Sequence, residues 1–119
     1  MRTKETKAIR FKEWDCVLDK CKYAENDNTA ILLYGVDDYS PIATATVNLS
    51  ISLPENQAYI KDYSENEGML EALKKAGVVK KVIGYGSSGY IDKIPLCELD
   101  LDIIAKLMIK CNLGGKYGI

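Results

Sequence analysis

The sequence contains no histidine. Histidine is the only side chain whose ordinary pKa lies near neutral pH, and it is the commonest protein ligand for metal ions. Its absence excludes His-based catalytic triads and every zinc or iron site that needs an imidazole ligand. Phenylalanine and tryptophan are also scarce, with one of each against eight tyrosines. The composition therefore favours a protein that acts through its surface. We expect neither an enzyme nor a cofactor.

Long apolar runs and a large excess of one charge are also missing. No segment approaches the roughly 18 consecutive apolar residues of a membrane span, and no signal-peptide apolar run of about 7 to 15 residues follows the charged start. The chain carries 16 basic and 17 acidic residues, for a net charge of -1. Because nucleic-acid binding depends on clustered positive charge, no sequence-specific nucleic acid is expected as a partner. We expect a cytoplasmic protein that is not attached to a membrane.

The four cysteines form neither a C-x-x-C motif nor a zinc-ribbon spacing. They lie at positions 16, 21, 97 and 111. We expect them to be reduced and mostly buried as small apolar side chains. The alternative, a reactive thiol, would need Lys, Arg or a helix N-terminus to stabilise the thiolate. No metal ligand and no catalytic residue is assigned.

The first half of the chain has the patterns of β-strands. Residues 14–23 alternate roughly between apolar and polar, turn formers follow at 25–28, and residues 30–36 are mainly apolar, which predicts a hairpin. Residues 42–53 alternate strictly, which predicts one long strand with an apolar face on the core. Its polar face is either solvated or lies under another element.

The second half predicts two helices and a second hairpin. Ser64 and Glu67 have the spacing of a capping box, and the apolar stripe behind them predicts a helix over 65–76 that ends at Gly77. Residues 78–85 and 90–97 predict a hairpin. Asp100 is the predicted N-cap of a last helix, whose apolar stripe runs to Cys111.

These elements together predict a single α+β domain over residues 1–119. Its antiparallel β-sheet of about five to six strands has two helices packed on one face. Residues 1–13 are predicted as a flexible arm or a short edge strand, and residues 113–119 as a loose tail.

The hairpin turn contains a formal G-x-G-x-x-G match. The dinucleotide-binding fingerprint needs a helix after the glycines, whereas a strand is predicted here, so that interpretation fails. Two interpretations remain: a tight turn with positive φ, or a loop whose backbone N–H groups bind a small anionic ligand or nucleotide. The residues of that ligand-binding alternative are Gly84, Gly86, Ser87, Ser88 and Gly89.

Tyrosine combines a rigid apolar ring with a polar tip, which suits protein interfaces. Several tyrosines lie near the predicted helix start or the glycine turn, beside acidic residues. The acidic residues at the helix starts also complement the helix dipole, and the pair Asp37 and Asp38 lies in a predicted turn. We predict a protein-binding surface that consists of Tyr63, Glu65, Glu67, Tyr85 and Tyr90.

Part of the chain resembles a family of small bacterial proteins. The segments are Ile60-Lys-Asp-Tyr-Ser-Glu-Asn-Glu-Gly-Met-Leu70, Gly77-Val-Val79, Ser88-Gly-Tyr90 and Pro95-Leu-Cys-Glu-Leu99. The family is a domain of unknown function carried on conjugative elements and phages, and the resemblance covers about residues 58–99. It supplies no catalytic residue.

The resemblance implies a non-enzymatic protein of a mobile genetic element that binds a host protein, for example as an inhibitor of a host defence system. The alternative is a small-ligand or nucleotide binder at Gly84–Gly89. The sequence is also compatible with a homo-oligomer.

Overall fold

The computed structural model describes residues 8–108. The predicted tail at 113–119 and the Cys111 end of the last apolar stripe lie outside these residues. The strands are β1 (Ile9–Phe11), β2 (Trp14–Lys22), β3 (Thr29–Gly35), β4 (Pro41–Thr44), β5 (Thr46–Val47), β6 (Gln57–Ile60), β7 (Val79–Ser88) and β8 (Ile91–Leu99). They are accompanied by the 3-10 helix η1 (Ser64–Asn66) and the α-helices α1 (Met69–Lys75) and α2 (Leu101–Leu107). None of the described helices is long and apolar enough to cross a membrane.

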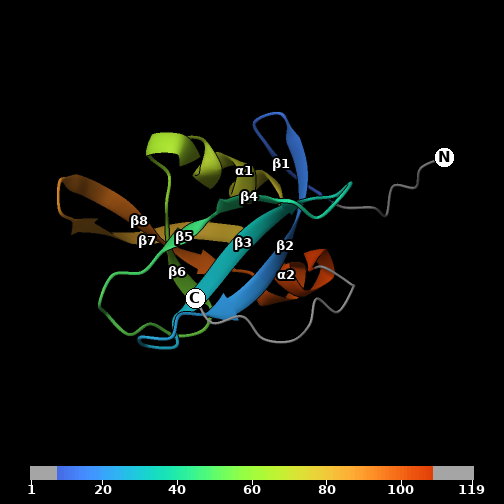
Figure 1. Ribbon diagram of the computed structural model, residues 1–119. Helices are drawn as coiled ribbons and strands as arrows, with labels where there is room; N and C mark the ends of the chain where they lie inside the picture. The colour runs from blue at the N-terminus through green and yellow to red at the C-terminus, as the bar shows by residue number, and fades with distance from the viewer. Residues whose placement is uncertain (1–7, 109–119) are drawn as a thin grey trace.

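The strands form two antiparallel sheets of four, not the single predicted sheet of five to six (Figure 1). Sheet A has the order β1-β2-β3-β4, and sheet B has the order β5-β6-β8-β7. The division occurs at the buried Ala45, whose N–H donates to the Ile31 carbonyl and whose own carbonyl accepts from the Lys61 N–H, both at 2.8 Å. One segment therefore pairs with sheet A before Ala45 and with sheet B after it.

Both sheets and both helices contribute to one main core. Strand β1 forms the edge of sheet A, which confirms the edge-strand interpretation for residues 9–11. Helix α1 buries Met69 and Leu73, and α2 buries Ile104 and Leu107, in the same cluster. The mixed α and β composition and the two helices are confirmed, although the helices cover two sheets instead of one.

The long strand predicted over 42–53 is wrong beyond Val47. Asn28 is 4% exposed, and its Nδ2 donates to the Asn48 Oδ1 at 3.0 Å and to the Ile51 carbonyl at 2.7 Å. Its Oδ1 accepts the Leu53 N–H at 2.8 Å. These three bonds hold residues 48–53 as a loop. The polar row therefore makes hydrogen bonds within the protein, at the half-buried Asn48 and at the buried Thr46, whose Oγ1 accepts the Ile31 N–H.

The predicted helix over 65–76 starts later than expected. Residues Ser64–Asn66 form η1, and Gly68, with a φ of 99°, precedes the first residue of α1. The capping box between Ser64 and Glu67 does not form, because the Glu67 N–H donates to the Ser64 carbonyl at 3.1 Å. The Asp62 Oδ1 instead accepts the N–H groups at the start of α1, those of Gly68 at 3.1 Å and Leu70 at 2.9 Å. The predicted end is confirmed, since Gly77 has a φ of 84° just after α1.

We expect Asp62→Ala to lower the free energy of unfolding by about 1 kcal/mol, because two N–H groups at the start of α1 lose their acceptor. Ser64→Ala, which removes the cap that the sequence predicted, is expected to change it by less than about 0.5 kcal/mol. Urea denaturation of the two variants beside the wild type measures both values. Equal losses would contradict the assignment of Asp62 as the capping residue.

The second hairpin and the last helix cap are confirmed. Asp100 Oδ1 accepts the N–H groups of Asp102 and Ile103, both at 3.1 Å. Strands β7 and β8 pair as far as Ser88 and Ile91. Strand β6 pairs with only three residues of β8, Leu96 to Glu98. The hairpin therefore continues past β6 as a two-stranded ribbon, which projects from the body of the protein in Figure 1.

Candidate protein-binding surface

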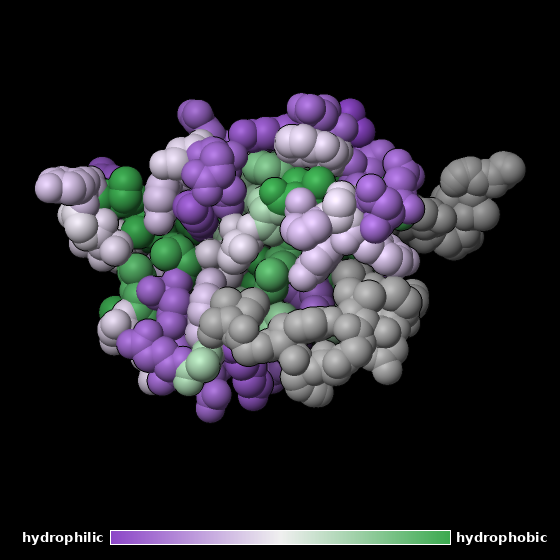
Figure 2. All heavy atoms as spheres, viewed as in Figure 1, coloured by the Kyte–Doolittle hydropathy of each residue, from purple (hydrophilic) through white to green (hydrophobic). Residues whose placement is uncertain are grey.

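Sheet B has apolar residues on both faces, but the two faces are covered unequally. The pair Ala58 and Cys97 faces the main core, whereas the next pair, Tyr59 and Leu96, faces the other way. This outer face carries a second, smaller cluster, called here the outer cluster. Its buried members are Leu49, Tyr59 and Ile94, and its partly exposed members are Val47, Leu53, Tyr63, Ile91 and Leu96. In Figure 2, hydrophobic residues gather on the side of the protein where the hairpin projects.

Gly86 allows the ribbon to pack closely on this cluster. It is opposite Ile94 in the β7–β8 register. A Cβ at Gly86 would lie 2.8 Å from the Tyr59 Cε1 and 2.9 Å from the Leu49 Cδ1, which is closer than van der Waals contact allows. The predicted turn glycine with positive φ is Gly89, at 61°. The glycines of the motif thus have separate structural roles, close packing at one position and a turn at the other.

The ligand-binding alternative for Gly84–Gly89 requires neighbouring N–H groups that converge on one anion. Residues 84–88 are extended and belong to β7, with Gly84 opposite Leu96 and Gly86 opposite Ile94. Along a regular strand, successive N–H groups point in opposite directions, which disfavours an anion-binding nest, and the alternation is interrupted only at the irregularity between Gly86 and Ser88. The geometry favours a structural role for these glycines over the ligand-binding alternative.

The five residues of the predicted protein-binding surface do not lie together. Tyr63 packs on the outer cluster, while Tyr90 is fully exposed at the tip of the hairpin. Tyr85 is 64% exposed, but it is opposite Pro95 and therefore lies on the other side of the ribbon from Gly84 and Gly86. Glu65 and Glu67 are exposed, and they follow Tyr63 by two and four residues in the sequence.

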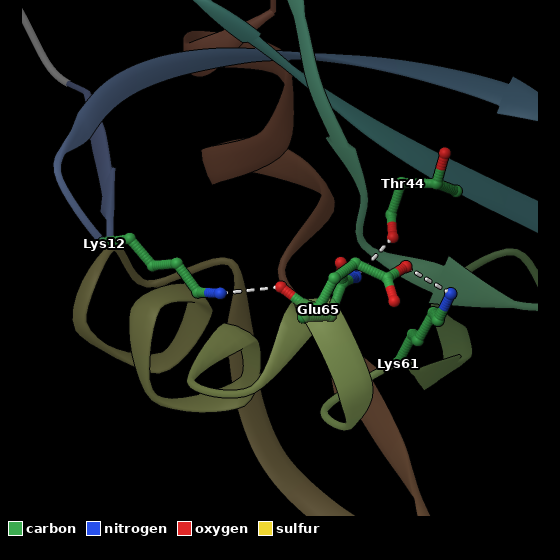
Figure 3. Close-up of polar contacts among 5 residues, drawn as sticks. Lys12, Thr44, Lys61 and Glu65 are labelled. Carbon is green, nitrogen blue, oxygen red and sulfur yellow. Dashed lines mark hydrogen bonds and ion pairs between the residues drawn. The ribbon is translucent and has the colours of Figure 1, made fainter.

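The segment around Tyr63 makes three polar contacts, one within the segment and two with other elements (Figure 3). The Lys61 Nζ lies 2.7 Å from the Glu65 Oε2, and the Lys12 Nζ donates to the Glu65 carbonyl at 2.7 Å. Asn66 Nδ2 donates to the Thr44 carbonyl, also at 2.7 Å. The hydrogen bond from Lys61 lowers the pKa of Glu65 and raises that of Lys61. These contacts connect the polar residues beside Tyr63 to the β1–β2 turn and to β4.

Strand β7 lies at the edge of sheet B, yet its edge is poorly suited to pairing with another strand. The β7–β8 ladder is irregular at three places, between Val79 and Lys81, Val82 and Gly84, and Gly86 and Ser88. Bulges and lysines at an edge disfavour the addition of a further strand. Contacts at this hairpin are expected to use side chains.

Most residues of the outer cluster carry no signal in the sequence that marks them as a separate cluster. The alternation predicts Leu49 and Leu53 on the core face of a long strand, and it predicts an ordinary hairpin for the strands that carry Ile91 and Leu96. Their alternation indicated only that they are apolar on one side. The pattern does not predict that sheet B has a second apolar face, because that depends on the division of the chain between the two sheets at Ala45.

The described cysteines are not activated nucleophiles. Burial raises the pKa of Cys16 and Cys97 to about 11, and burial followed by the Asp19 carboxylate raises that of Cys21 to about 11. All three are therefore thiols at neutral pH. Within residues 8–108, no three His, Cys, Asp or Glu side chains are placed to share a metal ion.

Comparison with known proteins finds no relative of this chain. The resemblance over residues 58–99 therefore stays a prediction, and the candidate surface rests on the geometry of the outer cluster. No family model, no curated protein and no solved structure matches the chain.

Proposed function

We propose that this chain is a protein-binding domain that acts by occupying a partner protein, without catalysing a reaction. Its contact surface is the outer face of sheet B together with the tip of the β7–β8 hairpin. The observation that carries the proposal is the outer cluster, in which five of eight apolar residues are only partly buried. A contiguous group of apolar residues that is only partly covered in a folded protein favours an interaction site at that place.

The arrangement around the outer cluster supports this role. Interfaces typically combine an apolar centre with a polar border, and here the Lys61–Glu65 ion pair borders the residues that pack with Tyr63. The tip residue Tyr90 adds a rigid aromatic side chain that is free to enter a recess in a partner. A surface that is already ordered loses little entropy on binding.

The more specific part of the proposal concerns the partner. If the resemblance over residues 58–99 holds, the chain belongs to a mobile genetic element and its partner is a host protein. Inhibition of a host defence system is one form of this role. A protein of this kind acts by blocking a surface of its target, which requires affinity and shape but no reactive group.

The test is a pulldown from a lysate of the native host with the wild type and the double variant Tyr63→Ala/Tyr90→Ala. The wild type is expected to recover one dominant protein, and the double variant to lose at least about 90% of it, because aromatic anchors often contribute about 2 kcal/mol or more each. Tyr90→Ala alone covers the case in which the loss of Tyr63 unfolds the domain. Tyr85→Ala, which removes an exposed tyrosine from the other side of the ribbon, is the matched control. Recovery of the same proteins by all variants would refute the proposed surface.

A further inference from the structure

A hollow of about 330 Å³ lies between the start of β2 and the loop that joins β3 to β4. In Figure 1 this loop is on the opposite side of the protein from the β7–β8 hairpin. Backbone hydrogen bonds hold its walls in place, because the Val36 N–H donates to the Asp15 carbonyl at 3.0 Å and the Gly35 N–H to the Ser40 carbonyl at 2.9 Å. The hollow is therefore a fixed feature of sheet A, separate from the outer cluster.

The apolar part of the hollow consists of Trp14, Val36 and Ile42. Trp14 is the only tryptophan in the chain, and it is 39% exposed. Val36, which faces the same space, is 36% exposed. A large indole left partly uncovered beside a recess is typical of a contact residue, because tryptophan is enriched among the residues that dominate binding energy.

The charged residues that line the hollow are all carboxylates, namely Glu13, Asp15, Asp37 and Asp38. Asp15 is paired with Arg10 at 3.0 Å, and Asp38 accepts the Ser40 N–H at 3.0 Å, which lowers the pKa of Asp38. Glu13 and Asp37 differ, since no Lys or Arg nitrogen of residues 8–108 lies within 4.0 Å of either carboxylate. The hollow thus combines an exposed indole with negative charge that is not neutralised within the described protein.

We propose that this hollow binds the guanidinium group of an arginine side chain presented by a protein partner. A guanidinium group stacks on an aromatic face and donates hydrogen bonds to carboxylates at the same time, which an ammonium group does less well. The volume lies at the lower end of the range for small-molecule sites, of about 300 to 1,000 Å³, and suits one side chain. The carboxylates are not placed to share a metal ion. This second contact goes beyond the proposed function, because it uses the other side of the protein.

The test uses the fluorescence of Trp14 and an acetylated Gly-Arg-Gly-Arg-Gly peptide, with the citrulline peptide as the neutral analogue. The arginine peptide is expected to change the fluorescence in a saturable way. Its affinity should fall as NaCl is raised from about 50 to about 500 mM, because salt screens exposed charges. Glu13→Gln/Asp37→Asn should weaken binding by at least about fivefold, as expected for the loss of charge-assisted hydrogen bonds. Asp92→Asn/Asp102→Asn, which removes two exposed carboxylates elsewhere, should bind as the wild type does.

Three outcomes would overturn the inference. They are equal binding of the citrulline peptide, an unchanged affinity of the Glu13/Asp37 variant, and an equal loss in the Asp92/Asp102 control. The last would indicate general attraction to an acidic protein. The Tyr63→Ala/Tyr90→Ala variant should bind the arginine peptide normally, so a failure of the proposed function is distinguishable from a failure at the hollow.

Discussion

Replacing Asn28 with alanine is expected to lower the free energy of unfolding by about 3 kcal/mol. The buried side chain makes three hydrogen bonds to residues 48–53, through Asn48, Ile51 and Leu53. Alanine removes all three, and each partner that stays buried without a replacement costs about 1 to 3 kcal/mol, partly offset where water enters. Because this loop carries Leu49 and Leu53 onto sheet B, the outer cluster should loosen as well.

Urea denaturation gives the free energy of unfolding for this variant, and hydrogen exchange of residues 48–53 shows whether the loss is local. Asn48→Ala is the graded control, since it removes only one of the bonds from Asn28 and should cost about 1 kcal/mol. A loss for Asn28→Ala no larger than that of Asn48→Ala would show that Asn28 does not hold the loop.

Gly86→Ala is expected to lower the free energy of unfolding by about 2 kcal/mol. The new methyl group would lie under 3.0 Å from carbon atoms of Tyr59 and Leu49, and overpacking a filled cluster typically costs about 1 to 3 kcal/mol. Tyr59 is only 6% exposed, so its ring has little room to move. The ribbon must then lift from the outer cluster, which also moves Tyr90.

Gly84→Ala is the matched control on the same strand. A Cβ there would meet the Leu96 Cδ2 at 3.8 Å, which is ordinary contact, so the change should stay within about 0.5 kcal/mol of the wild type. Thermal and urea denaturation of the two variants side by side compare them directly. If the two variants have the same free energy of unfolding, the close approach of Gly86 to Tyr59 does not determine which residue is tolerated at position 86.

The two predictions connect stability with the proposed binding surface. Asn28 holds the loop on one side of the outer cluster, and Gly86 lets the ribbon approach it from the other. An isolated two-stranded ribbon is marginally stable in water, so the position of the hairpin depends on this cluster. A surface variant such as Tyr90→Ala should therefore affect binding without changing stability, whereas Gly86→Ala should affect both.

Local patterns predicted the elements whose signals are complete within a few residues. The hairpin of β2 and β3 follows from alternation around a polar turn, and Asp100 follows from N-cap chemistry. Gly77 follows the end of α1, because the positive φ of this position favours glycine. Tyr85 and Tyr90 are exposed, and the protein-binding role assigned to them stays a prediction.

Contacts between distant residues decided the rest. The strict alternation at 42–53 meets every local requirement of a strand, but the pairing at Ala45 and the bonds from Asn28 divide it between two sheets and a loop. Asp62 replaces the predicted cap because its carboxylate reaches N–H groups six and eight residues later. The sequence by itself thus determined which segments are apolar and where they turn, since those depend on neighbouring residues. Only the tertiary structure decided that sheet B has a second apolar face, because that depends on how the chain divides between the two sheets. It also decided that Trp14 and Asp37 line one hollow, because that depends on the register in which β2 pairs with β3.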